Sequence, residues 1–160
     1  MTDIDNLSVP DSETTSPETA VSETSAPEET NPMVHDERVL DRDASALDRA
    51  KMAAQICADN RGRDIVILDL RKLSTAFDYF VIASGTSRRQ LHAMSEEIDR
   101  VFEKEQGDKR MGIEGYRESR WILLDYGDIV VHLFVDEARD FFRLEDLWGA
   151  AEKVDFTPIL

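Results

Sequence analysis

Hydrophobic positions follow two different periods along residues 43–156 of the chain. Between residues 43 and 62, and again between 87 and 107, apolar side chains recur every three to four residues, the spacing that predicts amphipathic helices. Continuous apolar runs rich in branched residues predict strands instead. Four such runs occur, at residues 64–70, 78–84, 121–126 and 128–135.

Polar residues and glycines mark the ends of these predicted elements. Ser87 with Gln90 has the spacing of a capping box at the start of the second helix, and Gly107 is a natural end for it. Gly127 separates the last two strands, which predicts a hairpin. The glycine-rich segment between the second helix and that hairpin predicts a loop with a short strand near Ile113.

The order of the elements predicts the fold class. Two pairs of consecutive strands, each without a crossover, argue for antiparallel neighbours within a mixed sheet. Residues 137–153 predict one broken helix or two short ones. We therefore expect an α/β domain with α+β character, in which the helices cover mainly one face of the sheet.

Composition separates an acidic tail, residues 1–42, from the domain at residues 43–156. The first 37 residues contain ten Asp or Glu, no Lys or Arg, and four of the five prolines. Such a segment buries too little apolar surface to offset chain entropy, so we expect it to be disordered. It carries −10 of the formal net charge of −15.

The charge and the single cysteine narrow the classes of partner and the compartment. An acidic domain is a poor general binder of nucleic acid, because phosphate binding depends on Lys and Arg. We expect little direct nucleic-acid contact and favour a basic protein as partner. Cys57 is the only cysteine, which predicts a reducing compartment. No apolar run reaches the ~20 residues of a membrane span, and no targeting segment is recognisable, so we expect a cytoplasmic protein without membrane contact.

Two segments have some features of a catalytic site. Residues 84–89 join a strand to a helix start and include Arg88 and Arg89, which suits a phosphate. A capped helix start with solvent-facing arginines explains the same residues. Asp125 and Asp128 have the chemistry of a magnesium pair, but they stand three apart across a glycine turn, where Asp is favoured in any case. We therefore expect no catalytic residue, no metal and no cofactor, with a nucleotidyltransferase-like metal-dependent enzyme as the alternative.

Aromatic residues gather between Trp121 and Trp148, and this block is the favoured place for function. We expect Phe141, Leu144 and Leu147 to pack in the core under the terminal helix. For the two tryptophans the sequence leaves both readings open: core residues, or exposed anchors of the kind that dominate interface hot spots.

His132 lies in an apolar strand on the same face as Val130 and Phe134. A lone histidine in such a place is more often a hydrogen-bonded core or interface residue than a catalytic base.

These segments together resemble the ribosomal silencing factor family, also called RsfS or Iojap, over about residues 45–154. The matching motifs are residues 78–90 (DYFVIASGTSRRQ), Glu114-Gly115, residues 121–134 (WILLDYGDIVVHLF), and Arg139 with residues 144–148 (LEDLW). The motifs are long, in order and correctly spaced, so the resemblance is specific.

The resemblance implies a mixed five-stranded sheet like that of nucleotidyltransferases, without their catalytic acids. It also implies a non-enzymatic factor that binds the large ribosomal subunit through its protein numbered fourteen. There such factors block small-subunit joining and repress translation when nutrients are limiting. It implies a set of partner-binding residues, namely Trp121, Asp125, Tyr126, Asp128, His132, Arg139 and Phe142.

Two features depart from the family. Members often have Tyr at the position of Phe142, so a hydroxyl contact there is in doubt. The acidic tail has no counterpart in short members, so nothing carries over to it. A homodimer of the free protein is also plausible, because an open aromatic face of the sheet can pair with itself.

Overall fold

The computed structural model describes residues 32–160, with side chains from residue 45 onward. The disorder expected for residues 1–31 lies outside the described residues. Helix α1, Pro32–Asp59, is the first described element. The domain boundary expected between residues 42 and 43 falls inside this helix. No helix in the described part of the chain combines the length and the apolar character that crossing a membrane requires.

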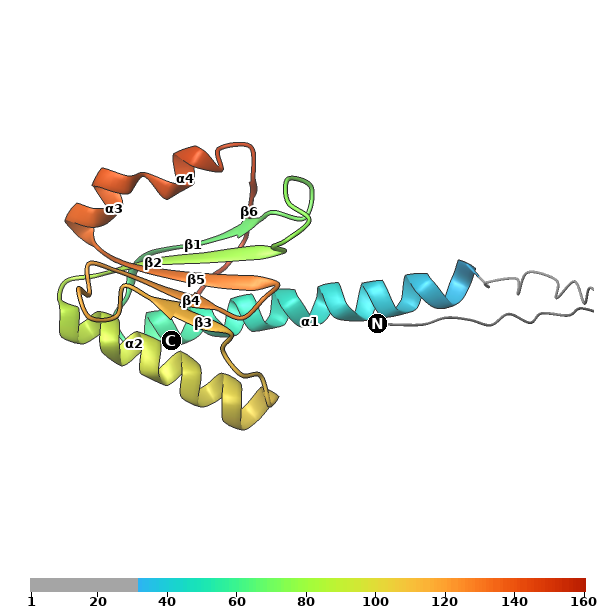
Figure 1. The fold of residues 1–160 in the computed structure, drawn as a ribbon, viewed down its shortest axis with the longest axis horizontal. Coiled ribbons are helices and arrows are strands. Elements are labelled where there is room, and N and C mark those ends of the chain that lie inside the picture. Colours follow the sequence, from blue (N-terminus) through green and yellow to red (C-terminus); the bar gives the residue numbers. More distant parts are fainter. Residues whose placement is uncertain (1–31) are drawn as a thin grey trace, which may run out of the picture. The chain divides into compact units, whose positions relative to one another are not determined.

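A six-stranded mixed sheet forms the centre of the domain, in the order β3-β4-β5-β2-β1-β6 (Figure 1). Only β2 and β5 are parallel, and every other neighbouring pair is antiparallel. The expected mixed sheet and the β4–β5 hairpin are therefore confirmed. The strands are β1 (Arg63–Asp69), β2 (Tyr79–Gly85), β3 (Gly112–Glu114), β4 (Trp121–Asp125), β5 (Ile129–Val135) and β6 (Glu152–Val154).

The sixth strand corrects the expected count of five. β6 is three residues long and pairs with β1 at the sheet edge. It lies at the end of a segment that the sequence assigned to helix. Three residues are too few to show an alternating period, so pattern reasoning had no signal for this strand.

Two layers of helix lie on opposite faces of the sheet (Figure 1). Helix α1 and helix α2, Arg88–Val101, cover one face, and a π-helical turn, Phe102–Gln106, extends α2. The short helices α3, Asp136–Phe142, and α4, Leu144–Leu147, lie over the other face. The expectation that helices cover mainly one face is confirmed, because α3 and α4 together have only eleven residues.

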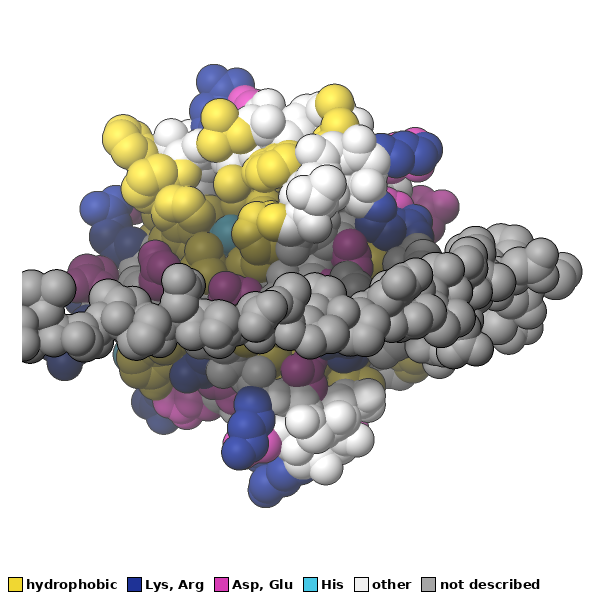
Figure 2. All heavy atoms as spheres, turned by 45° about the vertical axis from the view of Figure 1, so that its right-hand side comes forward, with side chains coloured by type: hydrophobic (Ala, Val, Ile, Leu, Met, Phe, Trp, Pro, Cys, Tyr) yellow, Lys and Arg dark blue, Asp and Glu magenta, His cyan; other side chains and the backbone are white. Residues whose placement is uncertain are grey.

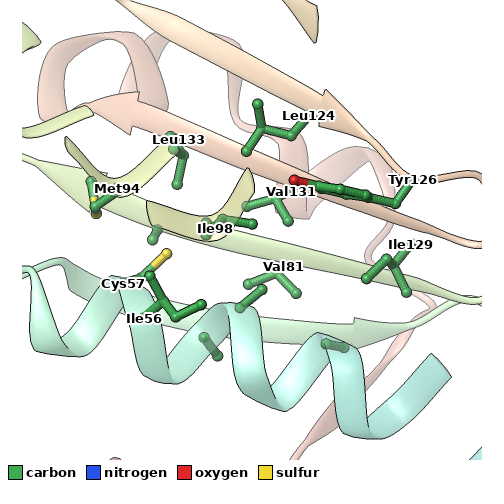
Figure 3. Close-up of a cluster of buried hydrophobic side chains, with 14 of the residues drawn as sticks. Ile56, Cys57, Val81, Met94, Ile98, Leu124, Tyr126, Ile129, Val131 and Leu133 are labelled. Atoms are coloured by element: carbon green, nitrogen blue, oxygen red, sulfur yellow. The ribbon is translucent and has the colours of Figure 1, made fainter. Parts of the chain in front are cut away.

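The larger core lies between the sheet and the helices α1 and α2. Strand alternation sends Val81, Val131 and Leu133 toward these helices, where they meet Cys57 and Ile98 (Figure 3). All five side chains are fully buried. A smaller apolar cluster lies on the opposite face, and that face carries the candidate site.

The start of α2 has the local chemistry that the sequence predicted. Ser87 is the N-cap and its hydroxyl accepts the backbone N–H of Gln90 at 3.2 Å. A Cβ atom on Gly85 would lie 2.6 Å from a methyl group of Leu91, so glycine allows α2 to approach the strand closely. Strand β2 ends at Gly85 and α2 begins at Arg88. The close approach at Gly85 and the cap at Ser87 therefore both lie in the short turn between them.

A candidate partner-binding face

The face of the sheet opposite α1 and α2 is rich in aromatic rings. Strand alternation directs Phe80 of β2, Trp121 of β4, and His132 and Phe134 of β5 to this side. Because α3 and α4 are short, they leave part of this cluster in contact with solvent. Figure 2 shows hydrophobic side chains gathered over the side that carries these two helices. We call this surface the aromatic face.

Trp121 lies at the centre of the aromatic face and is half-buried. Its ring stacks on Phe134 with centroids 4.9 Å apart and meets Phe142 at 4.8 Å. The structure therefore combines the two interpretations that the sequence left open, since the indole packs against Phe134 and Phe142 and is still partly exposed to solvent. Trp148 is also half-buried and packs edge-on against Phe80 at 5.4 Å.

His132 lies beneath the tryptophan and is 3 % exposed. Its Nδ1 accepts the indole N–H of Trp121 at 3.1 Å. Because Nδ1 is the acceptor, the neutral ring carries its proton on Nε2, an atom that is buried without a hydrogen-bond partner among the described residues. Burial lowers the pKa of His132 to about 3. The ring is therefore a neutral support for Trp121 and not a proton acceptor near neutral pH.

Two residues expected in the core are instead exposed, so that part of the sequence interpretation was wrong. Phe141 is 78 % exposed and Leu147 is 77 % exposed, whereas Leu144 is buried as predicted. The reason is the break between α3 and α4, where Arg143 adopts a left-handed conformation with φ 48°. Each helix is then so short that one residue, Ala138 or Leu144, is buried against the sheet.

An open groove of about 400 Å³ borders the tryptophan. Apolar atoms come from Trp121 and from the face of α3, and the rim carries both a carboxylate and a guanidinium group. Its shape and lining suit the side chain of a partner protein, because hot-spot residues fill pockets of this kind. The lining residues are Gly115, Glu118, Arg120, Trp121, Ala138, Phe141 and Phe142.

Arg139 and Asp125 border the aromatic face, and each has a structural role. Arg139 donates to the hydroxyl of Ser84 at 2.9 Å and to the carboxylate of Glu145 at 2.8 Å. It thereby ties the end of β2 to α3 and α4. Asp125 accepts the backbone N–H of Gly127 at 2.8 Å and closes the hairpin turn.

Tyr126 and Asp128 lie away from the aromatic face. Tyr126 is 4 % exposed, packs against Phe102 and donates its hydroxyl to Asp99 at 2.5 Å. Burial raises the pKa of Tyr126. Asp128 forms an ion pair with Arg49 of α1. The structure thus brings together Trp121, His132 and Phe142, with Asp125 and Arg139 at the edges, but not these two residues.

The segments with possible catalytic chemistry have other roles in this fold. Asp125 and Asp128 bind different groups, a turn amide and an arginine. Arg88 and Arg89 are exposed beside a capped helix start, as the simpler interpretation predicted. Among residues with described side chains, no cluster of three or more His, Cys, Asp or Glu is arranged to hold a metal ion.

Sequence reasoning missed Phe80 as a member of the aromatic face. Strand alternation places Leu123 on the same side as Trp121, and the structure shows both beside the smaller apolar cluster. Phe80 occurs in a continuously apolar strand, where alternation says nothing about which face is open. The sequence predicted a broken helix in residues 137–153, but no glycine or proline marks the break at Arg143, on which the exposure of Phe141 depends.

Comparisons with known proteins find similar sequences over most of the chain. Residues 43–160 match the family model described as "Ribosomal silencing factor during starvation". The chain is 42 % identical over 105 residues to the ribosomal silencing factor RsfS of Bacillus subtilis, which covers 66 % of this chain and 88 % of that protein. It is 35 % identical over 99 residues to a mouse protein named mitochondrial assembly of ribosomal large subunit protein 1, covering 61 % of this chain and 43 % of that protein.

A solved structure is similar as well. The crystal structure of a Chromobacterium violaceum protein superposes with a TM-score of 0.61 at 36 % identity. The match covers 69 % of this chain and 91 % of that one.

Proposed function

Because this chain belongs to the ribosomal silencing factor family, we propose that it binds the large ribosomal subunit in the cytoplasm. The contact is made through the subunit protein numbered fourteen. The bound factor sterically blocks small-subunit joining and so represses translation when nutrients are limiting. The mouse relative is named for assembly of the mitochondrial large subunit, which supports the large subunit as the partner.

The observation that carries this proposal is the exposure of the aromatic face. Phe141 is 78 % exposed and Phe142 is 45 % exposed, and both line a groove beside Trp121. Contiguous apolar surface on a water-soluble domain is a mark of a protein interaction site. Burying these rings against a partner removes apolar area from water, at about 25 cal/mol for each Å².

The chemistry of the aromatic face favours binding over catalysis. Its one titratable ring, His132, is buried, neutral and occupied by the indole N–H of Trp121. Exclusion of the small subunit needs only a bulky domain held in the right place. A purely steric role is therefore consistent with every side chain of the face.

Carboxylates around the aromatic face favour a basic partner. Glu118 lines the groove, and Glu137 and Asp140 are exposed on α3. Opposite charges at an interface rim speed association and fix orientation more than they add affinity. A basic ribosomal protein meets this requirement.

The same face is also the proposed contact between two copies of the free protein. Exposed Phe141 and Phe142 then bury each other's apolar surface when no subunit is present. Light scattering after size-exclusion chromatography tests this: a monomer at every accessible concentration contradicts the homodimer. The ribosome proposal does not depend on the result.

Sedimentation with purified ribosomal subunits tests the proposed function. We expect the protein to travel with large subunits and not with small ones. Added before mixing, it should lower the fraction of joined ribosomes in a dose-dependent way. Failure to sediment with large subunits, or unchanged subunit joining at saturation, contradicts the proposal.

A further inference from the structure

The charge of the domain is not spread evenly. Three segments, residues 60–63, 86–92 and 116–120, contain six arginines and one carboxylate, that of Glu118. The chain as a whole has a formal charge of −15. These segments are thus a local reversal of the overall charge, and the fold places them side by side.

Side-chain contacts join the three segments at one end of the sheet. The side-chain amide of Gln90 donates to the backbone carbonyls of Asn60 and Arg61, at 2.9 and 2.8 Å. The ring of His92 stacks on Tyr116 with centroids 4.2 Å apart. We call this region the arginine end.

The arginine end adjoins the aromatic face. The carbonyl of Arg120 accepts the backbone N–H of Val135, the last residue of β5. Val135 in turn is paired with Gly85, three residues before Arg88. Arg120 also lines the groove beside Trp121.

The arginine end contains every arginine, among those with described side chains, that has no ion pair with a carboxylate. Among those with described side chains, seven form an ion pair with a carboxylate, including Arg63 of the arginine end, which pairs with Asp136. The other five have no such pair within the described residues, and all are exposed and lie at the arginine end. They are Arg61, Arg88, Arg89, Arg117 and Arg120.

We infer that the arginine end binds the phosphate backbone of ribosomal RNA while the aromatic face binds the ribosomal protein beside it. This inference rests on the proposed function. Exposed guanidinium groups without a carboxylate partner are suited to phosphate, which they bind through two parallel N–H groups. Because such contacts go to the backbone, they orient the protein without reading a base sequence.

The position of the arginine end favours RNA over an acidic protein. A protein of the large subunit lies on ribosomal RNA. When the aromatic face binds that protein, the adjoining arginine end therefore lies close to RNA phosphates. The overall negative charge still opposes binding to nucleic acid in general. Contact with RNA is therefore confined to the complex in which the aromatic face has already docked. The expectation from the sequence of little nucleic-acid contact then applies to the free protein.

The test compares two full-length variants that each lose three positive charges. R88Q/R89Q/R117Q removes three unpaired arginines outside the groove. K51Q/K104Q/K109Q removes three exposed lysines outside the three segments. The Kd for purified large subunits is measured for both, and for the unsubstituted chain, over a series of KCl concentrations. A second series measures the Kd for the isolated ribosomal protein numbered fourteen, freed of RNA.

We expect the arginine variant to bind large subunits at least about tenfold more weakly at low salt, with a slope of log Kd against log salt reduced by about 2, since each phosphate contact contributes about 0.7 to 0.9. Its Kd for the RNA-free protein should be unchanged, and the lysine variant should match the unsubstituted chain in both series. Circular dichroism checks that each variant is folded.

Three outcomes overturn the inference. An unchanged salt slope for the arginine variant excludes phosphate contacts at these residues. An equal loss of affinity for the RNA-free protein assigns the arginines to a protein partner instead. Tighter subunit binding by the arginine variant means that the three arginines bind an acidic segment instead, such as residues 1–37 of this chain. If the unsubstituted chain does not bind large subunits, the proposed function itself fails. In the other three outcomes the unsubstituted chain does bind them, and only the inference about RNA fails.

Discussion

The indole N–H of Trp121 in β4 donates to Nδ1 of His132, its diagonal neighbour in β5, at 3.1 Å. The bond fixes the angle at which a half-buried tryptophan stands on the aromatic face. It also fixes the tautomer of a histidine that is 3 % exposed. A rigid anchor loses less side-chain entropy on binding than a mobile one, so this pair suits the aromatic face to the partner binding proposed above.

The burial of His132 predicts a pH dependence of stability. Its folded pKa is about 3, below the ordinary value of about 6.5 in the unfolded chain. Between these two values the unfolded chain binds a proton that the folded chain does not, so the free energy of unfolding falls as the pH is lowered. The slope approaches about 1.4 kcal/mol for each pH unit well below 6.5.

Urea unfolding at several pH values from 7.5 down to about 5 measures this dependence, with His132→Gln as the comparison. Glutamine keeps an acceptor for the indole N–H but does not titrate. We expect the stability of the unsubstituted chain to fall more steeply than that of the variant on acidification. Parallel curves contradict a buried, neutral His132.

Phe141 offers a test of the aromatic face with little effect on folding. It is 78 % exposed, so Phe141→Ser should change the free energy of unfolding by less than about 0.5 kcal/mol. As part of a hot spot it should weaken large-subunit binding by about 2 kcal/mol, or about 30-fold in Kd. Sedimentation with subunits measures the second effect.

Ile159→Ser is the matched control for this substitution. Ile159 is 82 % exposed and is held by Gln55 of α1, on the opposite side of the sheet. It should leave subunit binding unchanged. Equal effects of the two variants mean that the aromatic face is not the docking surface.

Gly115 and Gly107 form a second matched pair, which tests how the loop before β4 is built. Both adopt positive φ, +70° and +63°. A Cβ at Gly115 would lie 1.9 Å from the backbone oxygen of Trp121, whereas nothing lies within 4 Å of one at Gly107. Gly107→Ala should therefore cost about 1 kcal/mol for the left-handed backbone alone, and Gly115→Ala about 1 to 3 kcal/mol more.

Thermal or urea unfolding of the two variants gives the difference directly. Gly115→Ala should also weaken subunit binding, because the displaced carbonyl belongs to Trp121, the proposed anchor residue of the aromatic face. Similar stabilities for the two variants contradict the close packing of this loop on Trp121.

Most of the sheet was predictable because its strands are long enough to show a period. The strands β1, β2, β4 and β5 have five to seven residues each. The pairs β1–β2 and β4–β5 join strands that are consecutive in the chain, so their antiparallel pairing could be predicted from the order of the elements. The three-residue strand β6 carries no such pattern. The parallel contact of β2 with β5 is long-range, and it supplies the mixed character that the order of elements predicted.

The candidate site was predictable in part, because its residues depend on packing as well as on alternation. Alternation placed His132 beside Phe134 on one face of their strand, and the structure brings Trp121 to that side and adds its hydrogen bond to His132. It could not show that Phe141 is exposed, because that follows from the left-handed Arg143 between two short helices. Nor could composition reveal the arginine end, since three distant segments supply it.

For Tyr126 the family resemblance and the burial of the side chain lead to different expectations. The resemblance suggested a partner contact, yet this tyrosine is 4 % exposed and donates to Asp99, which also pairs with Arg110. Tyr126→Phe removes a hydrogen bond to a charged acceptor that is itself partly solvated, so we expect a loss of about 1 kcal/mol in the free energy of unfolding.

Large-subunit binding by the folded Tyr126→Phe variant should be unchanged, because its hydroxyl lies on the side of the sheet covered by α2. Phe142→Ala is the comparison: its ring is 45 % exposed beside Trp121, so binding should weaken more than stability. Urea unfolding and sedimentation with subunits give both quantities for each variant. If Tyr126→Phe loses subunit binding while its stability is unaltered, the hydroxyl reaches the partner and the docking surface extends around the end of the hairpin.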